Sequence, residues 1–594
     1  MRDTHQEEGL VSNDVFIGKL IYRYLFPSII ALLGMQSSGF INSVIIGNRL
    51  GSAGLSVVSL VMPLVLVYYS IGSLIGVGAS IISGAALGRG DKDLCAKVYT
   101  LSYIVGVGIG VLMTVLGLFN LDRIVTLLGA DPEKFDRTRN YARFFIAGGS
   151  SWLLLYIPLN YLRVTGKPKP AMNMLLLLSF LNVSGCVIFV MLLDMGISGM
   201  ALASVTSATF TFVFGVICLR DTNSPLKLQN PGRAITQIVT IVAAGSPSAL
   251  NNVCRAVQVL SMNILIVRMG AGIFLPSYSL VSAVSDFLLA VTLGISQPML
   301  PLVGISFGEK DFRSIRIILK KSLILGNSII GICALLVLFG SKKIGLIFGL
   351  QDGDIFQNAA RGLLFFACSI NLAFINNMIF NFFNATHRVA LANMIVVSRL
   401  VLFMVIPVWL LFPFTGINAV WISIVFTEAA TLGVAFLVTS ILHTKNHRLS
   451  RFLLLDSTLI ENSPVIDFSV KNTVEDVDTA SSRISGFCEE NELSPKKAMH
   501  ISLAIEEMLI MVNEYSLRKD KIEYTDVRIM ITGERITMRI RASGKHFNPV
   551  EYYYENKDTE AGASQTLGIA MILKMAQSVE YEETFGVNNL IIAI

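Results

Sequence analysis

NYLRVTGKPKPAMN (residues 160–173) and NFFNATHRVALAN (residues 381–393) are two similar segments that lie 221 positions apart in this chain. Two further pairs of segments repeat at an offset of 220, LGRGDKD with FGEKDF and MGISGMA with TGINAVW. The alignments superpose Asn160 on Asn381, Thr165 on Thr386, Ala171 on Ala392, Gly88 on Gly308, Asp91 on Asp311, and Gly196 on Gly416. Because three separate anchors keep the same spacing to within one residue, the sequence indicates an internal duplication.

The two copies consist largely of apolar segments that are long enough to cross a membrane. Of the 594 residues, 53% are hydrophobic and 15% charged, and the mean hydropathy is +0.65, which excludes an ordinary soluble class. A helix needs about 20 mainly apolar residues to span the hydrocarbon layer. The segments that meet this criterion lie near residues 16–40, 53–80, 97–118, 142–163, 171–193, 196–219, 236–266, 273–300, 319–340, 362–384, 389–412 and 417–441.

Basic residues predict which side of the membrane is cytosolic. They gather after even-numbered spans, as Arg89, Lys92, Lys97, Arg163, Lys167, Lys169, Arg220, Lys227, Arg233, Lys310, Arg313, Arg316, Lys320, Lys321 and Arg388. We therefore expect a multi-pass protein of the cytoplasmic membrane with both termini in the cytosol. The first span lacks the basic-then-apolar order of a cleaved signal and is expected to stay. The net charge of +6 is assigned to these loops, so no nucleic-acid partner is expected.

The expected fold is an all-α polytopic membrane protein, with twelve transmembrane helices in two parallel six-helix lobes, followed by a cytosolic α/β-sandwich domain. The expected parts are a cytosolic N-terminus (1–15), an N-terminal lobe (16–220), a cytosolic inter-lobe linker (221–235), a C-terminal lobe (236–443), a juxtamembrane linker (444–464) and the cytosolic domain (465–594). Two parallel repeats favour a transporter over a channel or a membrane enzyme, because alternating access needs two bodies that move about a central site.

Residues 16–443 resemble the multidrug and toxic compound extrusion (MATE) family. The resemblance is carried by the repeat anchors, by SSGFINSVIIGNRLGSAGLSVVSL, LNVSGCVIFVMLLDMGISGMALASV and GISQPMLPLVGISFGEKD, and by the run from Asn381 to Trp421. It implies two lobes of six helices. It also implies export of amphipathic, often cationic small molecules by antiport against a proton or sodium gradient.

The resemblance further implies two acids in the first lobe, one five residues before the glycine of a V-G motif and one four residues after an asparagine. These positions hold Asn42, before Gly47, and Cys186, after Asn182. Neither an amide nor a thiol exchanges a proton near neutral pH as a carboxylate does. We therefore expect the first lobe to have lost that coupling site.

The second lobe contains four ionisable residues deep in its predicted spans, Arg255, Asp286, Arg399 and Glu428. A charge at mid-bilayer costs roughly 2.5–3.5 kcal/mol on insertion scales, so such residues are paired, hydrated or functional. Arg255 stands eight residues after Pro247, at a position where the resemblance to several sodium-coupled relatives implies a cation-binding glutamate. The arginine is expected to be a fixed counter-charge for Asp286 or for an anionic substrate. Two interpretations stay open: structural Arg255–Asp286 and Arg399–Glu428 pairs, or ion coupling by Asp286 or Glu428.

Uncharged polar residues of the predicted cavity are candidate substrate contacts. They are Asn42, Asn182, Asn263, Asn376 and Asn377, with Arg255 as the charged member of the set. Asparagine also joins helices by hydrogen bonds, and this alternative stays open.

After Leu442 the sequence predicts a separate domain. SPKKAMHISLAIEEMLIMVNEYS begins with a Ser494 cap and Pro495, followed by apolar residues at helical spacing. VRIMI with ITMRIR, and SVEYEETFGVNNLIIAI, alternate as two hairpins, and SQTLGIAMILKMAQ between them is a predicted helix. The expected product is a mixed sheet with helices on one face.

Residues 465–594 resemble the histidine-kinase-like ATPase fold of anti-sigma-factor kinases. The resemblance implies a glutamate and, four residues later, a magnesium-binding asparagine on one helix face. Glu507 fits the first role, but position 511 is Met511. Asn513 does not replace the ligand, because two further residues turn a helix by roughly 200°.

The adenine-binding motif of that fold, D-x-G-x-x-F, is also incomplete. Its spacing survives as Ala542, Gly544 and Phe547, without the acid that accepts the adenine amino group. Gly568 stands alone where two glycines are typical. We expect a degenerate domain that needs no cofactor and has a structural or protein-docking role; weak binding of ATP and magnesium is the alternative.

Three functions follow as hypotheses. The first is a secondary active exporter, not an enzyme, whose partners are membrane lipids, a small-molecule substrate and a coupling proton or sodium ion, with the pseudo-ATPase tail as a regulatory domain. The second is a transporter-derived sensor or scaffold whose tail docks a cytosolic protein. The third is a flippase for an anionic lipid-linked substrate, favoured by Arg255 and Arg399.

Overall fold

The computed structural model of this chain forms two compact units. The membrane unit comprises Leu25–Pro301 and Ser322–Val438, and the tail unit comprises Met1–Tyr24, Leu302–Lys321 and Thr439–Ile594. The structure describes residues 14–88, 92–164, 168–220, 226–268, 274–296, 299–308, 311–349, 353–386, 388–455, 464–517, 522–532, 535–557, 566–584 and 587–594.

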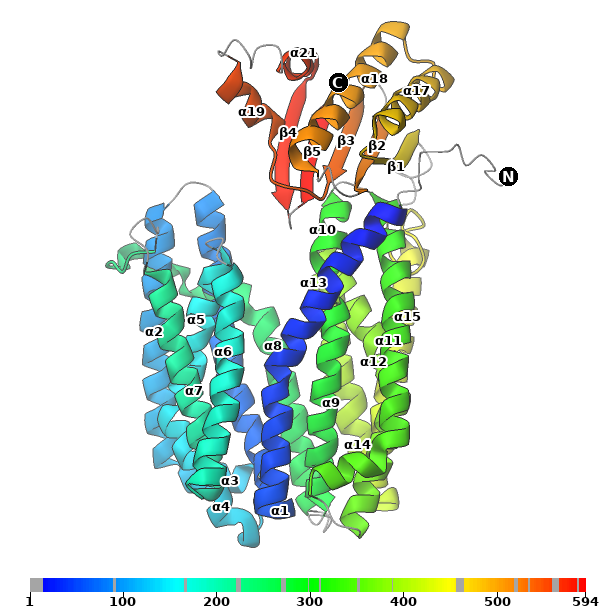
Figure 1. The fold of residues 1–594 in the computed structure, drawn as a ribbon. Helices are drawn as coiled ribbons and strands as arrows, with labels where there is room; N and C mark the ends of the chain where they lie inside the picture. Colours follow the sequence, from blue (N-terminus) through cyan, green and yellow to red (C-terminus); the bar gives the residue numbers. More distant parts are fainter. Residues whose placement is uncertain are drawn as a thin grey trace. The chain divides into compact units, whose positions relative to one another are not determined.

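The membrane unit is helical (Figure 1). The helices that lie in it wholly or in part are α1 (Asp14–Gly88), α2 (Lys92–Phe119), α3 (Leu121–Leu127), α4 (Pro132–Gly148), α5 (Ser150–Val164), α6 (Pro168–Cys186), η1 (Val187–Leu192), α7 (Gly196–Leu219), η2 (Gly232–Gln237), α8 (Ile238–Ile266), α9 (Leu275–Ser296), α10 (Met299–Gly308), α11 (Phe312–Ile347), α12 (Asp354–Ala385), α13 (Val389–Val397), η5 (Ser398–Leu402), α14 (Phe403–Thr415) and α15 (Asn418–Lys445). In the first half α7 packs against α4, α5 and α6, and in the second half α12 packs against α9 and α13.

The predicted count of twelve spans is not confirmed. The described residues contain ten helices long and apolar enough to cross a membrane, or eleven if the bent pair Pro132–Gly148 and Ser150–Arg163 forms one span. The difference arises in part because α1 comprises two helices that follow each other directly across a kink at Gly51 (φ 66°, ψ −162°), so the first two predicted spans are counted as one. Only glycine adopts this backbone conformation readily, so a bend at Gly51 replaces the expected loop.

Equivalent residues of the two repeats have equivalent local structure. Gly196 and Gly416, which start α7 and precede α15, have φ values of 60° and 57°. Their left-handed backbone explains why glycine stands at both positions. Ala171 and Ala392 are both buried at the starts of their helices. The duplication is therefore visible in backbone geometry, although Asp91 and Thr165 lie outside the described residues.

A close helix crossing joins the two halves of the sequence inside the membrane unit. A Cβ atom on Gly78 of α1 would lie 2.0 Å from the carbonyl oxygen of Ile241 of α8, and a Cβ on Gly245 would lie 2.0 Å from that of Leu74. Small residues allow helix backbones to approach this closely in a membrane, where packing rather than the hydrophobic effect drives association. The first repeat thus contacts the second through its own backbone.

Large apolar side chains lie on the outside of several helices of the membrane unit. On α2 the exposed residues Ile104, Val107 and Val111 recur at helical spacing, and Phe210 and Val213 do the same on α7. An apolar stripe of this kind on a soluble protein would expose a large patch to water. Contact with lipid hydrocarbon removes that cost, which is consistent with the composition.

The domain at the end of the chain is built on a five-stranded sheet with the order β1-β2-β3-β5-β4. The strands are β1 (Val465–Lys471), β2 (Tyr524–Thr532), β3 (Arg535–Ala542), β4 (Ser578–Thr584) and β5 (Val587–Ala593). All four pairings are antiparallel, so the prediction of a mixed sheet is wrong. Two helices lie between β1 and β2, and an even number of helices returns the chain in the opposite direction.

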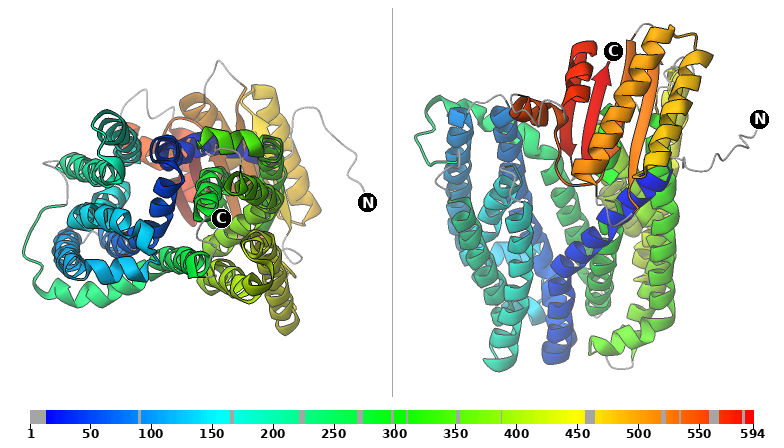
Figure 2. Two further views of the ribbon diagram at one scale, coloured as in Figure 1. Left: turned by 90° about the horizontal axis from the view of Figure 1, so that it is seen from below. Right: turned by 45° about the horizontal axis from the view of Figure 1, so that its top comes forward.

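Helices cover one face of this sheet (Figure 2). They are α17 (Val474–Glu490), α18 (Pro495–Met511) with its π-helical extension η6 (Val512–Ser516), α19 (Pro549–Asn556) and α21 (Leu567–Met575). The predicted cap is confirmed, because the Ser494 side chain accepts a hydrogen bond from the Lys497 amide at 3.4 Å. Both predicted hairpins and the predicted helix near the end of the chain are present, whereas β1, α17 and α19 had not been predicted.

Candidate functional site

In the first half of the membrane unit, the two positions expected to hold acids lie in a buried polar cluster. Asn42 donates a hydrogen bond from its side-chain nitrogen to the side-chain oxygen of Asn182, whose own nitrogen donates to Ser207 at 3.2 Å. Cys186, four residues after Asn182 on α6, is fully buried in an apolar cluster with Val190 and Ala203. An amide and a thiol therefore occupy the two positions where carboxylates were expected, and neither group titrates near neutral pH as a carboxylate does.

Asn263 of α8 contacts Ser59 of α1, away from the close crossing at Gly78 and Gly245. Its side-chain oxygen accepts from the Ser59 hydroxyl at 2.9 Å, and its nitrogen donates to the Ser59 carbonyl oxygen at 2.6 Å. The side chain is completely buried. Both ends of the amide are thus used between helices, and a substrate contact by Asn263 stays a prediction.

The second half contains a buried polar network around Glu428 on α15. Arg399, in the π-helical segment η5, donates to one carboxylate oxygen of Glu428 from two nitrogens, each at 2.7 Å. Asn376 on α12 donates to the other oxygen at 2.8 Å. Asn377 accepts from Arg399 at 2.9 Å and donates to Thr292 on α9 at 3.0 Å. The network therefore links four segments of the second lobe through one carboxylate.

This network is deeply buried and electrically balanced. The Glu428 and Arg399 side chains are 11% and 16% exposed, and Asn376 and Thr292 are fully buried. A buried ion pair persists only with good geometry and additional hydrogen bonds, and this one has both. The π-helical turn η5 widens the backbone at Arg399, and such turns are frequent at functional sites. Sequence analysis named these residues but did not predict that Asn376 and Asn377 hold the ion pair between them.

A second ion pair joins Arg255 of α8 to Asp286 of α9. It is less enclosed than the first, because the two side chains are 26% and 37% exposed. Both predicted pairs thus form, and they differ in environment. The Glu428 carboxylate accepts from three donor nitrogens and is largely enclosed, whereas the Asp286 carboxylate pairs with Arg255 and is more accessible.

The nucleotide-binding remnants of the tail do not fit ATP and magnesium. Met511, at the position of the magnesium ligand, and Ala542, at that of the adenine acceptor, are both buried in the apolar core of the domain. The Glu507 carboxylate packs directly on α21, because a Cβ on Gly568 would lie 2.2 Å from its oxygen. The residues that would hold the metal and the base are therefore core residues, and no chemistry is assigned to a nucleotide.

The remaining motif residues support the loop after β3. A Cβ on Gly544 would lie 2.3 Å from the Ser516 carbonyl oxygen, so this position requires glycine. Phe547 stacks on Tyr515 with ring centroids 5.1 Å apart, and Tyr552 donates to the Tyr515 hydroxyl at 2.9 Å. That hydrogen bond, together with burial, raises the pKa of Tyr515 to about 12. Gly544 and Phe547 of the motif therefore have a structural role in this loop.

The tail unit contains a charge cluster that sequence analysis missed. Asp311, one of the repeat anchors, is surrounded by Arg528, Arg539 and Arg541 of the sheet, with N–O distances of 2.7 Å to Arg539 and 3.5 Å to Arg541. The signal was present in the sequence, because DVRIM and MRIRA place charged residues at alternate positions of predicted strands. Alternation places such residues on one face, but it does not reveal what covers that face.

Comparisons with known proteins agree with this geometry. Residues 27–188 and 247–410, more than half of the chain, match the MatE family profile, and residues 470–594 match that of the histidine kinase-like ATPase domain. The multidrug export protein MepA of Staphylococcus aureus is 24% identical over 57% of this chain and 75% of its own length. The probable multidrug resistance protein YoeA of Bacillus subtilis is 25% identical over 57% and 73%.

Solved structures show the same fold. An inward-facing multidrug resistance MATE family transporter of the MOP superfamily aligns with a TM-score of 0.62 at 20% identity, over 69% of this chain and 97% of its own. A MOP superfamily transporter from Pyrococcus furiosus, described as having a binding pocket of reverse polarity that suggests a different function, aligns with a TM-score of 0.58 at 20% identity, over 71% and 95%.

Proposed function

This chain belongs to the MatE family of membrane transporters, and on that premise we propose that it exports amphipathic small molecules from the cytosol in exchange for a proton or a sodium ion. In this proposal the protein lies in the cytoplasmic membrane with both termini in the cytosol. The basic residues after the even-numbered spans support that orientation. The second lobe, rather than the first, provides the coupling site.

The observation that carries this proposal is the single carboxylate of Glu428 at the centre of a network of four segments. Loading it with a proton or a competing cation removes the attraction that holds Arg399. Arg399 is also bound to Asn377, which in turn reaches Thr292 on α9. A change of charge at Glu428 therefore alters contacts on α9, α12, η5 and α15 together, as coupling of an ion to helix movement requires.

The test is transport by the purified full-length protein in proteoliposomes with an imposed proton or sodium gradient and a cationic dye. Glu428→Gln keeps the size of the side chain and the hydrogen bond from Asn376 but cannot carry a negative charge. We expect gradient-driven flux to fall by at least about tenfold, which corresponds to an increase of roughly 1.4 kcal/mol in the activation free energy of transport. Asp286→Asn is measured beside it, because Asp286 is the second candidate for coupling.

The matched control is Asp354→Asn, the same chemical change at an exposed acid in the first turn of α12. This variant should transport as the wild type does. Flux that survives Glu428→Gln undiminished would exclude this carboxylate from the mechanism. Flux lost equally in the Asp354→Asn control would show that the assay reports stability rather than coupling.

An anionic substrate is the second candidate, favoured by the accessible Arg255–Asp286 pair. The guanidinium of Arg255 stays charged, and its side chain is 26% exposed. It provides fixed positive charge where an anionic head group could bind. The same proteoliposomes distinguish the candidates, because Arg255→Gln should abolish flux of an anionic lipid and leave flux of a cationic dye intact.

A further inference from the structure

The sheet of the tail unit has two faces of opposite character. Val527, Ile529, Met538 and Ile540 point into the apolar core under the helices. The residues that alternate with them on β1, β2 and β3 are charged, and they are Asp467, Asp526, Arg528, Arg539 and Arg541. These side chains are 10% exposed or less, so this polar face is covered within the tail unit.

The acidic side chains of the sheet do not neutralise all three arginines of this face. Asp526 accepts from Arg539 at 3.0 Å and from Arg541 at 2.8 Å. Arg528, however, stands directly opposite Arg539 in the register, and its distance to the nearest acid of the sheet, Asp467, is 3.7 Å. Like charges directly opposite each other destabilise a sheet. The pair therefore requires an acid from outside the sheet.

Asp311 supplies that acid from the turn between α10 and α11. One carboxylate oxygen pairs with Arg528, and the other lies 2.7 Å from Arg539. The residue is completely buried. Although burial alone would raise its pKa, the three arginines and a hydrogen bond from Ser314 hold the pKa of this carboxyl well below its usual range. Asp311 is thus ionised and enclosed by positive charge.

Asp311 has a second, local purpose that must be separated from the first. It caps α11, because its side chain accepts from the Ser314 amide at 3.0 Å and from the Ser314 hydroxyl at 2.6 Å. A simple helix cap needs neither arginines nor complete burial. The three guanidinium groups are therefore additional to the cap and come from a part of the chain more than 200 positions away.

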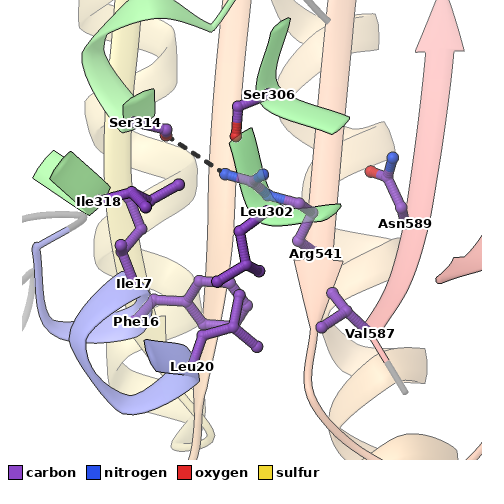
Figure 3. A pocket seen from close by; sticks show the side chains of 10 residues that line it. All are labelled: Phe16, Ile17, Leu20, Leu302, Ser306, Ser314, Ile318, Arg541, Val587 and Asn589. Carbon is purple, nitrogen blue, oxygen red and sulfur yellow. Dashed lines mark hydrogen bonds between the residues drawn. The ribbon is translucent and has the colours of Figure 1, made fainter. Parts of the chain in front are cut away.

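The start of α1, up to Tyr24, also belongs to the tail unit. Lys19 of α1 donates to the Ile522 carbonyl oxygen at 3.3 Å and lies 4.2 Å from the centre of the Tyr524 ring. Figure 3 shows a small cavity in the tail unit at which the three groups of segments meet. The cavity is lined by Phe16 and Leu20 of α1, by Leu302 and Ser314 of α10 and α11, and by Arg541 and Val587 of the sheet.

We propose that the arginine face of the sheet is a clamp that binds Asp311 and holds the end of α1, from the first repeat, together with the α10–α11 turn, from the second. The effect of this clamp on transport rests on the transport function proposed above. Alternating access requires helices of the two repeats to move relative to each other. A domain that binds ends of both repeats restrains this movement and slows transport until it is released.

The experiment combines two measurements on the full-length protein in proteoliposomes. Hydrogen–deuterium exchange of the segments around residues 311–321 and 524–542 reports the clamp, and gradient-driven dye flux reports its consequence. Asp311→Asn removes the charge but keeps the cap, because asparagine caps helices as well as aspartate does. Arg539→Gln removes one binding partner, and Asp354→Asn is the control acid at the start of another helix.

We expect Asp311→Asn and Arg539→Gln each to speed exchange in both segments and to raise flux by about fivefold or more, the lower end of typical couplings between sites. The double variant should match Asp311→Asn, because that substitution alone already removes the charge that Arg539 binds on Asp311. Exchange unchanged from wild type in Asp311→Asn would overturn the clamp. Faster exchange with unchanged or lower flux would overturn the restraint. If no variant and no wild type transports, the transport proposal fails, and the exchange result alone decides whether Asp311 is bound.

Discussion

Breaking the Arg399–Glu428 pair from one side should cost far more stability than removing both charges. In Arg399→Met the Glu428 carboxylate stays buried and keeps only its hydrogen bond from Asn376, at 2.8 Å. Removing one partner of a buried pair typically costs about 3–5 kcal/mol, because the remaining charge is desolvated without compensation. We expect the free energy of unfolding of Arg399→Met to fall by that amount.

Adding Glu428→Gln to this variant should restore most of the loss. A neutral amide at position 428 no longer needs a cation, and Asn376 can still donate to its oxygen. The coupling free energy between the two positions should therefore reach about 2 kcal/mol, within the range for residues of one network. Arg361→Met is the control, because Arg361 is exposed and donates to Asn418 at 3.1 Å. Exposed substitutions of this kind change stability by about 0.5 kcal/mol or less.

The assay is equilibrium unfolding of the full chain in mixed micelles with increasing SDS, followed by tryptophan fluorescence. All three tryptophans lie in the membrane unit, and Trp421 lies on α15, two helical turns before Glu428. The signal therefore reports the unit that contains the network. Equal stability of Arg399→Met and the Arg361→Met control, or additive effects in the double variant, would refute the reasoning.

Three further predictions concern other parts of the chain. Gly245→Val should prevent folding, because any Cβ there would lie 2.0 Å from a backbone oxygen, whereas Gly331→Ala, with open space around it, should give wild-type yields in size-exclusion chromatography. Burial raises the pKa of Asp467 in the folded tail, so the wild type loses stability as the pH rises from the unfolded pKa of about 4 through this raised pKa. Asp467→Asn should therefore unfold at a higher temperature than wild type at pH 7, and it should lose this advantage below about pH 4. Calorimetric titration of the full chain with ATP and magnesium should show no binding tighter than about 1 mM, and restoring the acid with Ala542→Asp should not change this while Met511 stays in the core; micromolar binding by the wild type would contradict the prediction.

The sequence by itself determined the classes of structure and their order. Apolar length and the repeated anchors predict a duplicated helical membrane protein, because the bilayer requires long apolar helices and a duplication preserves its own spacing. Alternation predicts the hairpins of the tail, since side chains of a strand point to opposite faces. The residues at the motif positions, Met511 and Ala542 beside Glu507, predict the loss of nucleotide chemistry, because the type of a side chain is read directly from the sequence.

Only the tertiary structure decided which polar residues meet. Asn376 and Asn377 are adjacent in the sequence, yet one binds the acid and the other the base of the same ion pair. Asp311 is a repeat anchor in the sequence, but its partners are arginines more than 200 positions away. Local patterns fix the direction of a side chain relative to its own helix or strand, whereas contacts between distant segments depend on how these elements pack, which no local period encodes.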